Sequence, residues 1–149
     1  MISQELINDI IILAIWACLL FSCYTDLKYR TISNKIVIII FILVILNFAL
    51  GKGHLDYIAS AIFLICGLFM FYCRLVGAGD IKLITVLLIS IPINSVPFFL
   101  VVITFLGLPM AIIAIIYRSF KKNSVTLPYG LAISGSYFLT SITLFEVIL

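Results

Sequence analysis

The chain has 149 residues, of which 65% are hydrophobic and only 10% are charged. A soluble domain has roughly half apolar and a quarter charged residues, so this composition excludes a water-soluble globule and a disordered chain. The net charge of +3 is too small to suggest a nucleic-acid partner. We therefore expect an integral membrane protein.

Apolar runs separated by polar residues predict about six membrane-spanning helices. Because one crossing takes about 20 residues, these helices would use most of the chain. We expect a single all-α, polytopic membrane domain over residues 1–149. The predicted spans are residues 6–25, 35–50, 57–73, 80–91, 96–117 and 129–148.

The positions of the basic residues predict the orientation of these spans. One basic residue, Lys52, lies in the loops 51–56 and 92–95. Eight lie in or beside the other three loops, 26–34, 74–79 and 118–128: Lys28, Arg30, Lys35, Arg74, Lys82, Arg118, Lys121 and Lys122. Since cytoplasmic loops carry an excess of Lys and Arg, these three loops are predicted to be cytoplasmic and both termini non-cytoplasmic.

Asp26 and Asp80 are the two acids on the predicted cytoplasmic side, each where an apolar helix meets the boundary. Carboxylates there are costly and usually have a partner or a function. Each could be an ordinary helix-end residue, Asp80 as an N-cap or either one paired with Lys28 or Lys82. Residues two apart do not face each other on a helix, however. Two facing carboxylates can instead share one proton and activate a water molecule against a peptide carbonyl.

The residues around the two aspartates fit such a site. Gly77 and Gly79, just before Asp80, would let another backbone come close or simply form a tight turn. Asn34 is expected to be the N-cap of the second span. The one histidine, His54, has no second ligand near it in the sequence, so we expect neither a metal nor a cofactor.

Three segments resemble the signature segments of type IV prepilin peptidases, which are polytopic aspartyl proteases of the GxGD class. They are Asp26-x-Lys28-x-Arg30-x-Ile32-Ser33-Asn34, Gly77-x-Gly79-Asp80-x-Lys82-Leu83 and Leu127-Pro128-Tyr129-Gly130. All three fall on the predicted cytoplasmic side, and the resemblance covers nearly the whole chain.

The resemblance implies that the chain cleaves the leader of prepilins or pilin-like precursors after a glycine, at the cytoplasmic face of the cell membrane. Asp26 and Asp80 would be the catalytic pair. The implied partners are the precursor peptide and membrane lipids, whose anionic headgroups could meet the basic rim. The residues expected to shape the site without doing chemistry are Gly77, Gly79, Lys28, Lys82, Asn34, Pro128 and Gly130.

Two departures from the family pattern narrow the resemblance. Longer members carry a region with CxxC motifs and also methylate the new N-terminus. Here the cysteines form no CxxC and are expected to be packing residues within the spans, so no separate methyltransferase region is expected: Cys18, Cys23, Cys66 and Cys73. Ser33 stands where the longer enzymes often have proline. The small size is more like the short Tad/Flp-type enzymes or the preflagellin peptidases.

Two interpretations from other functional classes stay open at this point. A small transporter or ion-conducting subunit could use membrane-edge carboxylates to bind a cation or relay protons, although both acids lie at one face. A non-enzymatic assembly protein of a pilus or secretion system would tolerate the loss of either aspartate.

Overall fold

The computed structural model describes residues 2–51, 53, 55–73, 76–121 and 129–148. Within these residues the chain is all-helical, with six α-helices and one short 3-10 helix, as the sequence predicted. Each predicted apolar segment coincides with one helix. The elements are α1 (Ile2–Tyr29), α2 (Asn34–Ala49), α3 (Tyr57–Tyr72), α4 (Ala78–Ser90), η1 (Ile93–Ser95), α5 (Val96–Lys121) and α6 (Gly130–Ile148).

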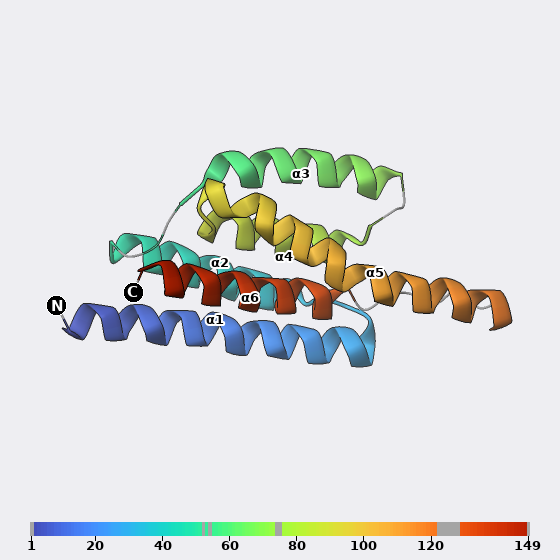
Figure 1. Cartoon of the computed structure of the whole chain (residues 1–149), viewed down its shortest axis with the longest axis horizontal. Helices are drawn as coiled ribbons and strands as arrows, with labels where there is room; N and C mark the ends of the chain where they lie inside the picture. Colours follow the sequence, from blue (N-terminus) through green and yellow to red (C-terminus); the bar gives the residue numbers. More distant parts are fainter. Residues whose placement is uncertain (1, 52, 54, 74–75, 122–128, 149) are drawn as a thin grey trace.

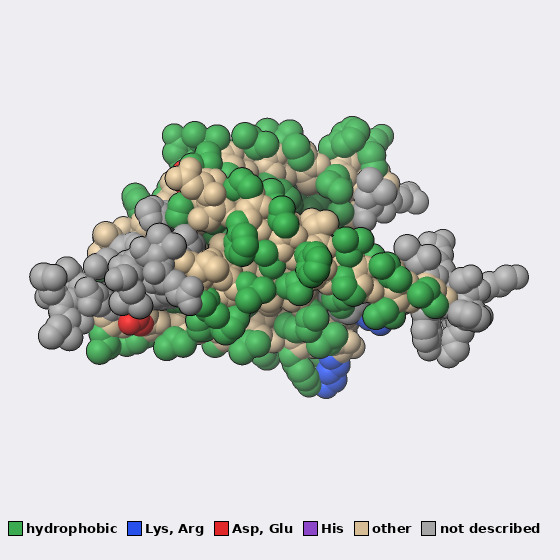
Figure 2. Space-filling view, viewed as in Figure 1, with side chains coloured by type: hydrophobic (Ala, Val, Ile, Leu, Met, Phe, Trp, Pro, Cys, Tyr) green, Lys and Arg blue, Asp and Glu red, His purple; other side chains and the backbone are tan. Residues whose placement is uncertain are grey.

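The lengths and composition of the helices point to a membrane protein. Two segments, Asp9–Tyr29 and Ile93–Ile113, are long and apolar enough to cross a bilayer. Two shorter helices, α2 and α3, are also apolar, with 16 residues each. Large apolar side chains cover most of the described surface on the face that Figure 2 shows. The number of crossings and the sides of the termini stay predictions.

The short helix α4 lies at the centre of the bundle. It packs against α2, α3 and α6, while α1 packs against α2 and α6, and α5 packs against α6. Figure 1 shows α1 and α6 side by side, with α3 on the far side of α4. Shielding by its neighbours explains how a fourth predicted span of about 12 residues can belong to the bundle.

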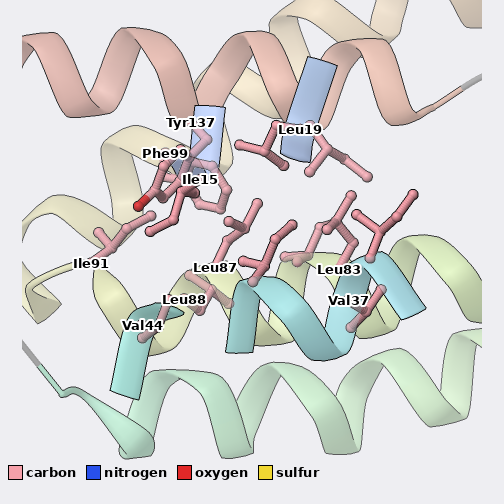
Figure 3. Close-up of a cluster of buried hydrophobic side chains, with 14 of the residues drawn as sticks. Ile15, Leu19, Val37, Val44, Leu83, Leu87, Leu88, Ile91, Phe99 and Tyr137 are labelled. Atoms are coloured by element: carbon pink, nitrogen blue, oxygen red, sulfur yellow. The ribbon is translucent and has the colours of Figure 1, made fainter. Parts of the chain in front are cut away.

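The buried core is built around α4. Three leucines of this helix are fully buried: Leu83, Leu87 and Leu88. Side chains from α1, α2, α5 and α6 converge on them (Figure 3). Among these partners Phe99 and Tyr137 meet edge to face, with ring centroids 6.4 Å apart. Because α4 meets neighbours on several sides, its position is fixed more tightly than that of an outer helix.

The two ends of the bundle differ in charge. The connection from α1 to α2, the start of α4 and the start of α6 all lie at one end (Figure 1). On the face that Figure 2 shows, the blue basic side chains lie toward this end and the red acidic side chains lie toward the opposite one. The described basic side chains of the first end are Lys28, Arg30, Lys35 and Lys82.

Several boundaries differ from the sequence prediction. α1 continues to Tyr29, so Asp26 lies inside the helix and does not end it. α4 begins at Ala78, which puts Gly79 in its first turn and not in a loop. The prediction that Asn34 is an N-cap is wrong: Ser33 holds that position in an extended conformation, and Asn34 is the first helical residue.

Two of the four cysteines are not the packing residues that we expected. Cys66 and Cys73 are exposed, whereas Cys18 and Cys23 are half-buried. The reason is the outer position of α3, which packs mainly against α4 and leaves its other faces uncovered. All four are free thiols.

We expect Leu87→Ala to lower the free energy of unfolding by roughly 2–5 kcal/mol, because it leaves a cavity in a fully buried part of the core. The matched control is Leu20→Ala on α1, where the leucine is 70% exposed and the change should stay within about 0.5 kcal/mol. Denaturant titration of the purified protein in detergent measures both. Equal losses for the two variants would contradict the central position of α4.

Candidate active site

Asp26 is a buried carboxylate near the end of α1. Its side chain is only 5% exposed. The backbone N–H of Gly130, the first residue of α6, donates a 2.7 Å hydrogen bond to Asp26 Oδ2. The first N–H groups of a helix have no acceptor within the helix and carry its positive dipole end, so they are natural partners for a carboxylate. Asp26 is therefore held at the meeting point of two helices.

Gly130 is required by this contact and not by its backbone angles. A Cβ atom at this position would lie 2.8 Å from Asp26 Oδ2 and 3.1 Å from Asp26 Cβ. Real Cβ atoms do not approach that closely, so any side chain would push the carboxyl group off the amide. The glycine that the sequence identified in the Pro-Tyr-Gly segment thus has a specific role, because it opens the start of α6 to Asp26.

Asp80 lies in the first turn of α4 and is half-buried. It lies at the same end of the bundle as Asp26, where the charge of one carboxyl group can act on the other. Gly77 is the N-cap and Asp80 the third helical residue, the arrangement of the acidic half of a capping box. Two carboxyl groups from different helices therefore lie at the same end of the bundle.

The two glycines before Asp80 also allow neighbouring atoms to come close to the backbone. Gly77 has an ordinary extended conformation, with φ −73° and ψ 143°, so a strained turn is not its purpose. A Cβ on Gly77 would lie 3.0 Å from Asp80 Oδ2. A Cβ on Gly79 would lie 3.1 Å from Cβ of Ile32, in the segment between α1 and α2. Small residues thus let the Asp80 turn pack against the segment that follows Asp26.

The two lysines of the signature segments have different surroundings. Lys82 Nζ donates a 3.2 Å hydrogen bond to Asn34 Oδ1 and so joins α4 to the start of α2. Lys28 Nζ contacts the hydroxyl of Tyr24 at 3.3 Å and lies over the rings of Tyr24 and Tyr29. Lys82 and Asn34 therefore fix neighbouring helices at the site, whereas Lys28 engages aromatic side chains of its own helix.

The structure says little about the other residues that the sequence analysis singled out. Pro128 and His54 lie outside the described residues. Among the described residues, no three His, Cys, Asp or Glu side chains form a group that could hold a metal ion. Sequence reasoning missed Ile32 as the contact of Gly79, and it missed Gly107 on α5, against which the ring of Tyr129 packs. Both are ordinary apolar or small residues whose partners lie far away in the sequence.

Gly130→Ala is expected to destabilise the protein by roughly 1–3 kcal/mol, because the new methyl group displaces a buried carboxylate. The matched control is Gly135→Ala on the same helix, where the added Cβ meets only the terminal Cδ1 of Leu106, at 3.2 Å. That change should be neutral or stabilising by up to about 1 kcal/mol, since alanine favours helix. Unfolding measurements on both proteins test the contact, and equal effects would contradict it.

The model of the type IV leader peptidase family matches residues 11–112, more than half of the 149 residues. The matched part includes Asp26, Gly77, Gly79 and Asp80, while Gly130 lies beyond it. No curated protein and no solved structure matches the chain. The resemblance seen in the sequence is confirmed at the level of the family. The chain belongs to the type IV leader peptidase family and is a peptidase.

Proposed function

We propose that this peptidase is a membrane aspartyl endopeptidase that removes the leader of prepilins or pilin-like precursors. Asp26 and Asp80 are its catalytic pair, and the leader is cut after a glycine at the cytoplasmic face of the cell membrane. The whole of residues 1–149 forms one membrane-embedded peptidase domain with about six crossings. Gly77, Gly79 and Gly130 shape the site, and Lys82 with Asn34 braces it.

The observation that carries this proposal is that Asp26 of α1 and Asp80 of α4 lie at the same end of the bundle. Gly79, next to Asp80, packs against Ile32 in the segment that follows Asp26, so the charge of one carboxyl group can act on the other. Two other acids, Asp9 near the start of α1 and Asp56 just before α3, lie toward the opposite end of the bundle (Figure 1). There the Asp56 carboxylate accepts a hydrogen bond from the N–H of Ile93. A pair of carboxyl groups at a shared position is what general acid–base hydrolysis of a peptide requires.

The chemistry of such a pair needs one shared proton. The ionised carboxylate takes a proton from a water molecule, and the water oxygen attacks the carbonyl carbon of the scissile bond. The protonated carboxyl group donates its proton to the carbonyl oxygen, which gives a tetrahedral diol. When the diol collapses, one hydroxyl proton returns to a carboxylate, the nitrogen receives a proton and the C–N bond breaks. The pair ends in its starting state.

The Gly130 amide has a defined part in this scheme. It donates a hydrogen bond to Oδ2 of Asp26 and so fixes the rotation of the carboxyl group, which leaves Oδ1 available for proton transfer. A misplacement of about 1 Å can cost a hundredfold in rate, so orientation by a rigid backbone group is valuable.

The first test is co-expression with a tagged prepilin from the same genome. Asp26→Asn and Asp80→Asn should each abolish cleavage while the protein still inserts, because an amide can neither accept nor share the proton. The matched control is Asp9→Asn, an exposed acid of α1 whose variant should cleave at the wild-type rate. A gel shift reports cleavage, and mass spectrometry of the product maps the cut.

Cleavage at near wild-type rate by either Asp26→Asn or Asp80→Asn would disprove the catalytic pair. Failure of the wild type on several prepilins, with correct insertion, would favour another substrate or a non-enzymatic role.

The orientation can be tested through the native cysteines. Cys73 is exposed at the end of α3, at the same end of the bundle as the proposed site. A membrane-impermeant maleimide should label a variant that keeps only Cys73 in inside-out vesicles and not in right-side-out vesicles. A variant that keeps only Cys66, two turns earlier and exposed toward lipid, should resist labelling from both sides. The reverse pattern for Cys73 would place the site on the other face.

A further inference from the structure

The interface between α1 and α6 has a second hydrogen bond besides the one to Asp26. Ser134 Oγ lies 3.2 Å from the carbonyl oxygen of Leu19 on α1. The same hydroxyl lies 2.7 Å from the carbonyl oxygen of Gly130, one turn earlier on its own helix. The serine is 8% exposed, so water does not compete for this bond. Its single proton is shared between one acceptor on each helix.

Ser134 is directly linked to the residue that holds Asp26. Gly130 donates its N–H to Asp26, and its carbonyl accepts from Ser134. Because Ser134 also reaches Leu19, the first turn of α6 is fastened to α1 at two points along the helix. A rotation or slide of α6 that broke one bond would strain the other.

The other serine and threonine hydroxyls of α6 in the described part of the helix bond within the helix, whereas the Tyr137 hydroxyl lies 3.1 Å from Ser90 Oγ of α4. Ser136 donates to the carbonyl of Ile133, Thr140 to that of Ser136 and Ser141 to that of Tyr137. Such bonds back to the preceding turn are the default for a hydroxyl in an apolar helix. The bond of Ser134 to α1 is therefore an added feature and not a general property of small polar residues on this helix.

We propose that Ser134 is a positioning residue for Asp26, acting through the amide of Gly130. Its hydroxyl holds α6 in the register with α1 that aims the Gly130 N–H at Asp26 Oδ2. The inference rests on the proposed function for its catalytic consequence. The effect on the Gly130 amide is independent of any substrate.

A second serine of the same interface supplies a matched control. Ser22 lies on α1 one turn before Asp26 and is fully buried, yet its hydroxyl has no hydrogen-bond partner among the described residues. Removing an unpaired hydroxyl breaks no bond and is close to neutral. Ser22→Ala therefore makes the same chemical change on α1 and leaves the hydrogen bonds of Ser134 to Leu19 and Gly130 intact. Ser141→Ala removes an equally buried hydroxyl of α6 that bonds only to its own turn.

The experiment measures two quantities for the purified full chain in lipid nanodiscs. Hydrogen–deuterium exchange follows the Gly130 amide, and a cleavage assay with a purified prepilin gives kcat and KM. Ser134→Ala should speed exchange of the Gly130 amide by about tenfold, because the bond to Asp26 opens more often. It should lower kcat roughly ten- to hundredfold with KM changed by less than about twofold, since the substrate contacts are untouched. Ser134→Thr, which keeps the hydroxyl, should restore both values.

Unchanged exchange and unchanged kcat in Ser134→Ala would overturn the proposal. It would also fail if Ser22→Ala or Ser141→Ala matched the effects of Ser134→Ala, or if Ser134→Thr exchanged as fast as Ser134→Ala. Failure of the proposed function looks different, because then the wild type cleaves no prepilin while the exchange comparison still decides the role of Ser134.

Discussion

A carboxylate buried between two helices is the constraint on which the rest of this structure depends. Moving Asp26 out of water costs several kcal/mol unless a donor replaces the lost hydration. The donor is the Gly130 amide, whose position at the very start of α6 leaves it without an acceptor in its own helix. The hydrogen bond satisfies both the buried carboxylate and the unpaired N–H, and it sets how closely α1 and α6 approach.

That approach demands small side chains on α6. Gly130 and Ala132 are buried, as are Ser134 and Ser136. Close packing of helix backbones through such residues is typical of membrane proteins, where lipid supplies no hydrophobic drive for association. The aromatic pair of Trp16 and Phe138, with ring centroids 4.5 Å apart, fills the interface farther along. The small residues at the start of α6 thus allow the close approach that brings the Gly130 amide to Asp26.

The second carboxyl group, that of Asp80, is positioned by the packing of α4 and not, among the described residues, by a hydrogen bond between helices. Asp80 sits in the first turn, and the next residue, Ile81, is buried against Gly67 of α3, where an added Cβ would lie 2.7 Å from the isoleucine. Gly79 admits Ile32 on the other side. The turn that carries Asp80 is therefore fixed by contacts on two sides, and the fully buried leucines that follow hold the rest of the helix in the core.

The sequence was informative where the chemistry is local. Long apolar runs predicted every helix, and a charge beside such a run identified Asp26 and Asp80 as unusual. It was less informative where the cause is tertiary. The predicted end of α1 is too early because the apolar run stops before Asp26, and nothing in the sequence shows that α6 satisfies this acid. Asn34 was predicted to be an N-cap because Asn is favoured at that position. The sequence could not show that its side chain instead accepts a hydrogen bond from Lys82 of a distant helix. The resemblance identified Gly130, but only the structure shows its contact with Asp26.

The pairing of Asp26 with Gly130 also has a consequence for biosynthesis. The carboxylate belongs to α1 and its amide partner to α6, so α1 leaves the ribosome well before the helix that satisfies it. Until α6 is inserted, the Asp26 carboxyl group has no amide partner. This favours keeping that end of α1 near the water boundary. The proposed site is therefore completed only after α6 has been made and inserted. A nascent chain that has not reached α6 lacks the amide that orients Asp26.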